Sequence, residues 1–168
     1  MLIKAIIFDL GNTLIVEGNP LGRIEPFPDT VQVLTTLKER YKLALITNVR
    51  STMTVAYVEA VLREAGIHDI FDVITVSSVV GINKPTKHIF AMTLDQLHVK
   101  PKEALMVGNK ITTDIFGGNR IGMTTVLVQR GSTYQPGSWE IPDYTIHSFK
   151  ELLLIIESIT KEETINDG

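Results

Sequence analysis

Short apolar runs alternate along this chain with stretches whose apolar residues recur at helical spacing. The runs LALI and ALMV are almost continuously hydrophobic, which is typical of strands that are buried on both faces of a sheet. Strands that alternate with helices indicate βαβ units, and they predict a three-layer α/β/α sandwich around a mostly parallel, Rossmann-like sheet. We expect the strands at residues 3–9, 43–47, 73–77, 104–107, 125–128 and 144–146.

The helices are expected between the strands and after the last one. The first should begin at a cap on Asp29, and the second should end at Gly66. Later helices are expected over residues 86–97, from about Thr112, and over residues 149–159. The spacing assigns the apolar face of the first helix to Val31, Leu34, Leu37 and Tyr41.

Length and composition describe an ordinary globular chain. With 168 residues, 44% of them hydrophobic, it suits one domain, which we place at residues 1–160 with a polar tail at 161–168. A net charge of −3 offers no basic face for nucleic acid, and the lack of cysteine excludes disulfides and thiolate catalysis. We see no signal-peptide cleavage site and no apolar run near the roughly 20 residues of a membrane span. We therefore expect a cytoplasmic protein with no membrane or nucleic-acid partner.

Polar side chains follow the predicted strands at the edge where ligands bind in sheets of this kind. Each has a plain structural explanation, since Asp9 can cap a turn, Thr47 can begin a helix, and Lys84 can be a surface lysine. Taken together they supply metal acceptors, hydrogen-bond donors and cations, which suit a phosphoryl group beside a divalent ion. The set consists of Asp9, Asn12, Thr13, Thr47, Asn48, Arg50, Lys84, Asn109 and Asp114.

Four of these strand ends read FDLGNTL, LALITN, GINKPTKHIF and GNKITTD, and the last continues into GGNRIGM. In this order they resemble the motifs of the haloacid dehalogenase-like (HAD) superfamily of phosphohydrolases. The resemblance extends from Ile3 to about Ile156, and it implies a HAD-like fold.

The resemblance also implies roles for individual residues. Asp9 would attack phosphorus and form an aspartyl phosphate, and Thr47 and Lys84 would be the other catalytic residues. Phosphate or substrate would be bound by Asn12, Thr13, Asn48 and Arg50. The implied cofactor is Mg²⁺, held by Asp9, the backbone carbonyl of Gly11, Asn109 and Asp114. The expected partner is a phosphorylated substrate, either a small molecule or a macromolecule.

Two positions depart from the motifs. Gly11 stands where the family has an acid–base aspartate, whose help is typically worth ~100- to 10,000-fold. Asn109 replaces an aspartate and can offer a metal only a neutral oxygen. His88 is the best histidine candidate for the missing acid. Two alternatives to a phosphatase therefore stay open: a phosphate- or metal-binding regulatory module, and a slow phosphatase for good leaving groups such as acyl phosphates.

Family members often cover the site with a cap domain, but only residues 14–28 separate the first motif from the first helix. A small hairpin flap turning at Gly18-Asn19-Pro20 fits there. We therefore expect a capless member, with an open site that a neighbouring subunit of a homo-oligomer could enclose. Tyr134 and Trp139 could border the site or simply anchor their loop.

Overall fold

The computed structural model describes residues 2–18, 22–130 and 140–166, so Asn19, Pro20, Tyr134 and Trp139 lie outside the described residues. Its centre is a 6-stranded sheet in the order β3-β2-β1-β4-β5-β6. Every strand pairing in it is parallel. The strands are β1 (Ala5–Phe8), β2 (Lys42–Thr47), β3 (Val73–Val76), β4 (Ala104–Gly108), β5 (Thr124–Val128) and β6 (Tyr144–Ile146). The expected strands and fold class are confirmed, with small shifts at the strand ends.

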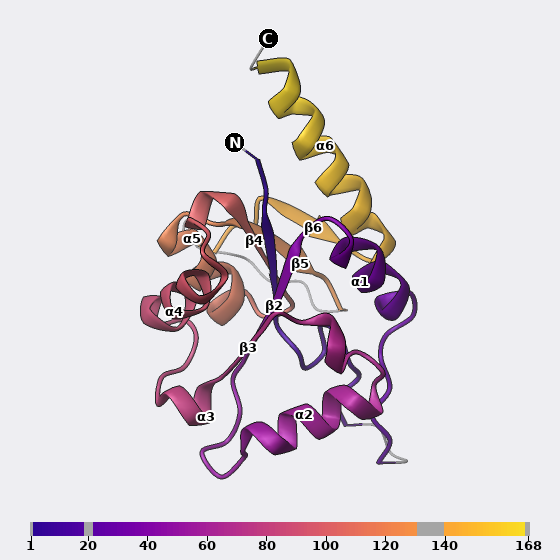
Figure 1. The fold of residues 1–168 in the computed structure, drawn as a ribbon, viewed down its shortest axis with the longest axis vertical. Helices are drawn as coiled ribbons and strands as arrows, with labels where there is room; N and C mark the ends of the chain where they lie inside the picture. Colours follow the sequence, from indigo (N-terminus) through magenta and orange to yellow (C-terminus); the bar gives the residue numbers. More distant parts are fainter. Residues whose placement is uncertain (1, 19–21, 131–139, 167–168) are drawn as a thin grey trace.

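Helices cover both faces of the sheet, which gives the expected three layers (Figure 1). Because side chains alternate along a strand, Ile6 and Phe8 point to one face while Ala5 and Ile7 point to the other. The first face packs against α1 (Thr30–Lys38), α2 (Val55–Glu64) and α6 (Lys150–Asn166). The second packs against α4 (Lys87–Leu97) and lies near α5 (Phe116–Ile121).

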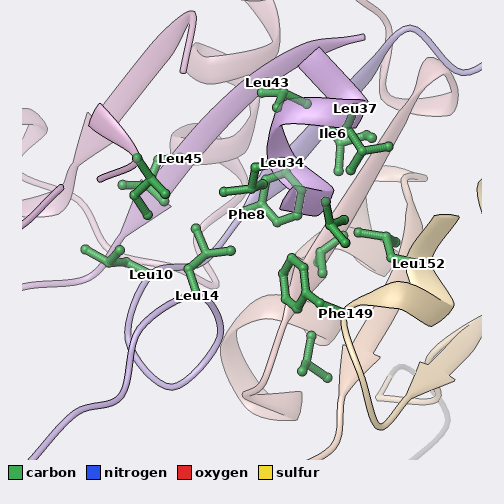
Figure 2. Close-up of a cluster of buried hydrophobic side chains, with 14 of the residues drawn as sticks. Ile6, Phe8, Leu10, Leu14, Leu34, Leu37, Leu43, Leu45, Phe149 and Leu152 are labelled. Carbon is green, nitrogen blue, oxygen red and sulfur yellow. The ribbon is translucent and has the colours of Figure 1, made fainter. Parts of the chain in front are cut away.

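The larger core cluster lies on the first face, where Phe8 meets Leu34 of α1 and Phe149 at the start of α6 (Figure 2). The Phe8 and Phe149 rings stack with centroids 6.1 Å apart and planes inclined by 27°. This contact joins the first strand to the last helix, so the two ends of the fold share one core.

The apolar face of α1 differs from the expectation. Thr30, Val33, Leu34 and Leu37 are buried, whereas Val31 is 39% exposed. The buried set follows the i, i+3, i+4, i+7 pattern of a helix stripe, and Val31 lies beside that stripe. Asp29 occupies the cap position, but its backbone is left-handed (φ 65°) and its side chain makes no capping hydrogen bond. It pairs instead with Lys150 of α6 at 3.1 Å.

The remaining helices follow the predictions more closely. The second ends where expected, since Gly66 after α2 has a φ of 72°, which favours glycine. The fourth begins with a π-helical turn, Ile111–Ile115, that continues into α5. Helix α6 reaches Asn166, so residues assigned to a polar tail continue the helix; the domain boundary itself stays a prediction.

The topology brings the ends of β1 and β4 together. From β1 the chain moves outward to β2 and β3, then crosses to β4 and continues outward to β5 and β6. The switch between the two directions lies between β1 and β4, and ligands of such sheets bind beyond the strand ends at this point. Among the helices described, none is long and apolar enough to cross a membrane.

Candidate active site

The centre of the site is an ion pair between Asp9 and Lys84. Asp9 follows β1, and its Oδ1 accepts a hydrogen bond from Lys84 Nζ at 2.7 Å. The same ammonium donates to the Ile46 carbonyl of β2 at 2.8 Å. Asp9 is 7% exposed and Lys84 is 3% exposed, so the pair is largely shielded from water. Lys84 therefore is not a surface lysine, and its ammonium lies against Asp9.

Asp114 gives Lys84 a second carboxylate. Its Oδ1 lies 2.8 Å from Lys84 Nζ, while its Oδ2 accepts the Lys110 N–H at 3.0 Å. Burial works against the charged form of Lys84, but the charges of Asp114 and Asp9 prevail and raise its pKa. Burial, with the nearby charge of Asp9, raises the pKa of Asp114 although Lys84 opposes this. Two carboxylates therefore share one buried ammonium.

A glycine at the end of β4 makes room for this arrangement. A β-carbon at position 108 would lie 2.3 Å from Asp114 Oδ2, so Gly108 is needed where the Asp114 side chain folds back toward Lys84. Asp114 was expected among the metal ligands, and here its carboxylate is engaged by Lys84 and Lys110. That ligand role stays a prediction.

The other oxygen of Asp9 belongs to a second group of atoms. Thr13 has one hydroxyl proton and donates it to Asp9 Oδ2 at 3.0 Å. Asn109 therefore turns its amide nitrogen to this point, where it lies 3.3 Å from Asp9 Oδ2, 3.2 Å from Thr13 Oγ1 and 3.2 Å from the Gly11 carbonyl, and its two hydrogens serve these acceptors. Asp9, Gly11 and Asn109, three of the expected metal ligands, thus converge on one place. Thr13 is fully buried and positions Asp9.

These atoms fit a hard divalent cation, because half a turn of the Asn109 amide places its oxygen beside Asp9 Oδ2 and the Gly11 carbonyl. The donor set carries little charge. Among the described residues, no three aspartates, glutamates or histidines cluster in a way that could hold a metal. A cation here would depend on one carboxylate and neutral oxygens, and its binding should be weak.

The residues after β2 have separate tasks. Thr47 is buried at the strand end and lines the recess that contains Asp9 and Lys84. Asn48 also lines it, and its side-chain amide binds the Lys84 peptide. Arg50 is exposed and lines a larger cleft nearby.

Two connected hollows meet at these residues. A recess of about 50 Å³ contains Asp9, Lys84 and Thr47. A cleft of about 560 Å³ opens beside it, between the segment after β1 and α2. Gly11, Glu17, Thr47 and Asn48 line both hollows, so they form the passage between them. This arrangement suits a substrate whose anionic group enters the recess while the rest lies in the cleft.

The flap between β1 and α1 is short and folds back on itself. Val16 N–H donates to the Glu25 carbonyl at 2.9 Å, and Phe27 N–H donates to the Leu14 carbonyl at 2.9 Å. Asn12, expected to bind phosphate, uses its side chain to hold Glu17: Nδ2 donates to Glu17 Oε2 at 3.0 Å, and Oδ1 accepts the Glu17 N–H at 3.1 Å. The hairpin expected here is thus present in the described part of the segment.

Sequence reasoning missed three residues of the recess: Glu17, Lys110 and Thr113. Glu17 could have been predicted, because it is an acidic residue on a flap so short that the flap must stay near the site. His88, the candidate for a missing acid, is exposed on α4 and is not among the described residues that line either hollow.

Comparison with known proteins identifies the family of this chain. A family model described as haloacid dehalogenase-like hydrolase matches residues 20–122. A glyceraldehyde 3-phosphate phosphatase of Methanopyrus kandleri is 35% identical over 144 residues, or 83% of this chain and 60% of that protein. Another of that name, from Methanocaldococcus jannaschii, is 30% identical over 168 residues, or 96% of this chain and 72% of that protein.

A solved structure shows the same fold. The HAD phosphatase of Thermococcus onnurineus has a TM-score of 0.76 and 24% identity, over 92% of this chain and 98% of that one. The chain therefore belongs to the haloacid dehalogenase-like hydrolases, the class that its sheet and strand-end site define. It spans about 60% of the length of the Methanopyrus kandleri relative.

Proposed function

We propose that this chain is a Mg²⁺-dependent phosphohydrolase that acts through an aspartyl phosphate on Asp9. The observation that carries the proposal is the placement of Asp9, with Oδ1 on Lys84 and Oδ2 in the oxygen set with Gly11 and Asn109. A carboxylate that attacks a phosphate dianion meets like-charge repulsion, and cations on both of its oxygens reduce that repulsion.

Each residue of the recess would have a different role in the reaction. Asp9 Oδ1 attacks phosphorus, Lys84 offsets the negative charge that develops, and the Thr47 hydroxyl and Asn48 N–H donate to phosphoryl oxygens. Asp9 Oδ2, the Gly11 carbonyl and Asn109 would hold Mg²⁺, which supplies charge neutralisation at the phosphoryl oxygens when it is bound. Thr13 and Asp114 position Asp9 and Lys84.

The substrate we propose is a small phosphomonoester. The two archaeal relatives are named as glyceraldehyde 3-phosphate phosphatases, and the cleft beside the recess has room for a short organic group next to Arg50. We also propose a cytoplasmic location. A homo-oligomer in which a neighbouring subunit covers the cleft would enclose such a substrate.

The proposal is tested by measuring phosphate release from p-nitrophenyl phosphate, acetyl phosphate and glyceraldehyde 3-phosphate, with Mg²⁺ and with EDTA. The wild type should release phosphate only with Mg²⁺, and Asp9→Asn should abolish release and the acid-stable phosphoenzyme. Turnover that survives Asp9→Asn would rule out the aspartyl phosphate.

The low charge of the metal set supports a second candidate, a phosphate- or metal-binding module without efficient turnover. In that case the wild type would bind Mg²⁺ and phosphate in calorimetry, yet release no phosphate from any compound of the panel.

A further inference from the structure

The space above Gly11 is occupied by a carboxylate from another part of the chain. A β-carbon at position 11 would lie 2.0 Å from Glu17 Oε1 and 2.4 Å from Glu17 Cδ. The Glu17 carboxyl group therefore stands where the side chain of residue 11 would otherwise stand. Gly11 is the position at which the first motif departs from the family pattern. The carboxylate of Glu17, from the flap, therefore stands where the family motif has the carboxylate of an aspartate.

Glu17 is held in this place by its neighbours. Asn12 forms two hydrogen bonds with it. Asn12 Nδ2 donates to the Glu17 carboxylate at 3.0 Å, and Asn12 Oδ1 accepts the Glu17 backbone N–H at 3.1 Å. The adjacent residue, Val16, is fixed by its hydrogen bond to the Glu25 carbonyl across the flap. The Asn12 amide engages Oε2, whereas Oε1 is the atom nearest to Gly11.

The position also suits proton transfer. Glu17 lines the recess with Asp9 and Lys84, and it lines the larger cleft as well. A phosphomonoester with its phosphoryl group at Asp9 and its organic part in the cleft would have the bridging oxygen at the passage between the two hollows. Glu17 is one of the few residues at that passage, and the others there carry no acid.

We propose that Glu17 is the general acid–base residue of this enzyme and takes over the task that Gly11 cannot perform. The inference rests on the proposed phosphohydrolase function. In the first step Asp9 Oδ1 forms a bond to phosphorus while the bond to the leaving oxygen breaks. The electron pair goes to that oxygen, which receives the proton of the Glu17 carboxylic acid and leaves as an alcohol.

The second step returns the site to its starting state. Water attacks phosphorus and gives a proton to the Glu17 carboxylate. The bond between phosphorus and Asp9 Oδ1 breaks, its electron pair returns to the Asp9 carboxylate, and phosphate leaves. Glu17 is then protonated again, so both steps balance with water as the co-reactant.

The variant that tests this role is Glu17→Gln, with Glu25→Gln as its matched control. Glutamine can still accept the Asn12 hydrogen bond. The flap therefore keeps its contact with Asn12, while the group can no longer transfer a proton. Glu25 is exposed on the opposite arm of the same flap and lines neither hollow among the described residues. Unchanged melting temperatures would show that both variants are folded.

The readouts are turnover of two substrates and the amount of phosphoenzyme. With glycerol 3-phosphate, whose alkoxide is a poor leaving group, Glu17→Gln should lower kcat/KM by ~100-fold or more. With acetyl phosphate, which needs no acid to leave, formation of the phosphoenzyme should persist. Acid-quenched Glu17→Gln should then contain more phosphorylated Asp9 than the wild type, because water is no longer activated.

A second variant tests whether an acid restored at position 11 recovers the activity lost with Glu17. Gly11→Asp alone would clash with Glu17, so it is made together with Glu17→Ala. The double variant should recover turnover of glycerol 3-phosphate relative to Glu17→Ala.

The outcomes separate the inference from the function on which it rests. Glu17→Gln that matches Glu25→Gln on both substrates, with no extra phosphoenzyme, would overturn the role of Glu17 while the proposed function stands. A wild type that forms neither phosphate nor phosphoenzyme would overturn both. If kcat/KM falls with Glu17→Ala but not with Glu17→Gln, Glu17 would only hold the flap in place. That result would also overturn the inference.

Discussion

The side-chain amide of Asn48 spans the peptide of Lys84. Asn48 Nδ2 donates to the Lys84 carbonyl at 3.0 Å, and Asn48 Oδ1 accepts the Lys84 N–H at 2.9 Å. The loop after β2 thereby fixes the backbone of the residue whose ammonium pairs with Asp9. Asn48 thereby positions Lys84, which we propose to be catalytic, through the Lys84 backbone alone.

Asn48→Ala should therefore lower kcat, because it loosens Lys84 beside Asp9. Loss of both hydrogen bonds should also cost about 1–3 kcal/mol of unfolding free energy, because the Lys84 peptide is left unpaired. Steady-state kinetics and urea unfolding measure the two effects. Asn83→Ala, an exposed asparagine one residue before Lys84, is the control and should change neither. A kcat equal to that of the control would contradict the positioning role.

Asn109→Asp should strengthen Mg²⁺ binding. The change adds one negative charge to a set that contains only the charge of Asp9, so we expect a dissociation constant on the order of tenfold lower, equal to about 1.4 kcal/mol. Isothermal titration calorimetry measures it without any turnover. Asn83→Asp adds the same charge outside the two hollows and should leave the affinity unchanged. Equal affinities of Asn109→Asp and wild type would remove Asn109 from the metal set.

Phe149→Ala should destabilise the fold. Phe149 is 1% exposed and stacks on Phe8, so its removal should lower the free energy of unfolding by about 3–5 kcal/mol. Thermal unfolding followed by circular dichroism checks this. Leu154→Ala is the control, since Leu154 lies on α6, which begins directly after Phe149, and is 66% exposed. A loss no larger than that of the control would mean that α6 contributes little to the core.

Asp72 should make stability depend on pH on the acid side. Burial opposes its ionisation, but hydrogen bonds from Lys38 and the Leu43 N–H prevail and hold its pKa below the usual value. A lowered pKa in the folded state gives stability that is present above the unfolded value of 3.8 and is lost as the pH falls through the folded value.

Asp72→Asn should remove that part of the pH dependence. Because Asp72 is 39% exposed and water screens its pair with Lys38, the loss near neutral pH should be only about 0.5–1 kcal/mol. Urea unfolding between pH 3 and pH 7 is the measurement, with the exposed Asp95→Asn as control. Parallel curves for Asp72→Asn and the wild type would show that Asp72 contributes nothing at acid pH.

The parallel sheet could be predicted from the alternation of strands and helices, and the pairing of Asp9 with Lys84 from the resemblance of the strand-end motifs. Parallel strands place their carboxyl ends at one edge, so residues that follow separate strands meet there whatever the loops do. Asp9 and Lys84 are 75 positions apart, and the topology brings the segments that carry them to the same edge of the sheet.

Other contacts depended on geometry that the sequence pattern does not contain. Glu17 reaches Gly11 through an irregular flap, where no helical or strand period relates one residue to another. Val31 was placed on the wrong face of α1 because one apolar residue beside a helix stripe resembles a member of it. The side-chain amides of Asn12 and Asn48 hold Glu17 and the Lys84 peptide, contacts that the sequence pattern does not reveal, while their expected role at the phosphate stays a prediction.

Two orientations of the Asn109 amide, which differ by half a turn of one torsion, fit its surroundings in different ways. With its nitrogen turned inward it satisfies Asp9 and Gly11 by itself, and with its oxygen turned inward it joins them as a third ligand. The empty and loaded states can thus share one backbone, and metal uptake requires no refolding of the loops. If the proposed Mg²⁺ site holds, its single carboxylate should bind the cation reversibly, so that the Mg²⁺ concentration would set how much of the protein is loaded.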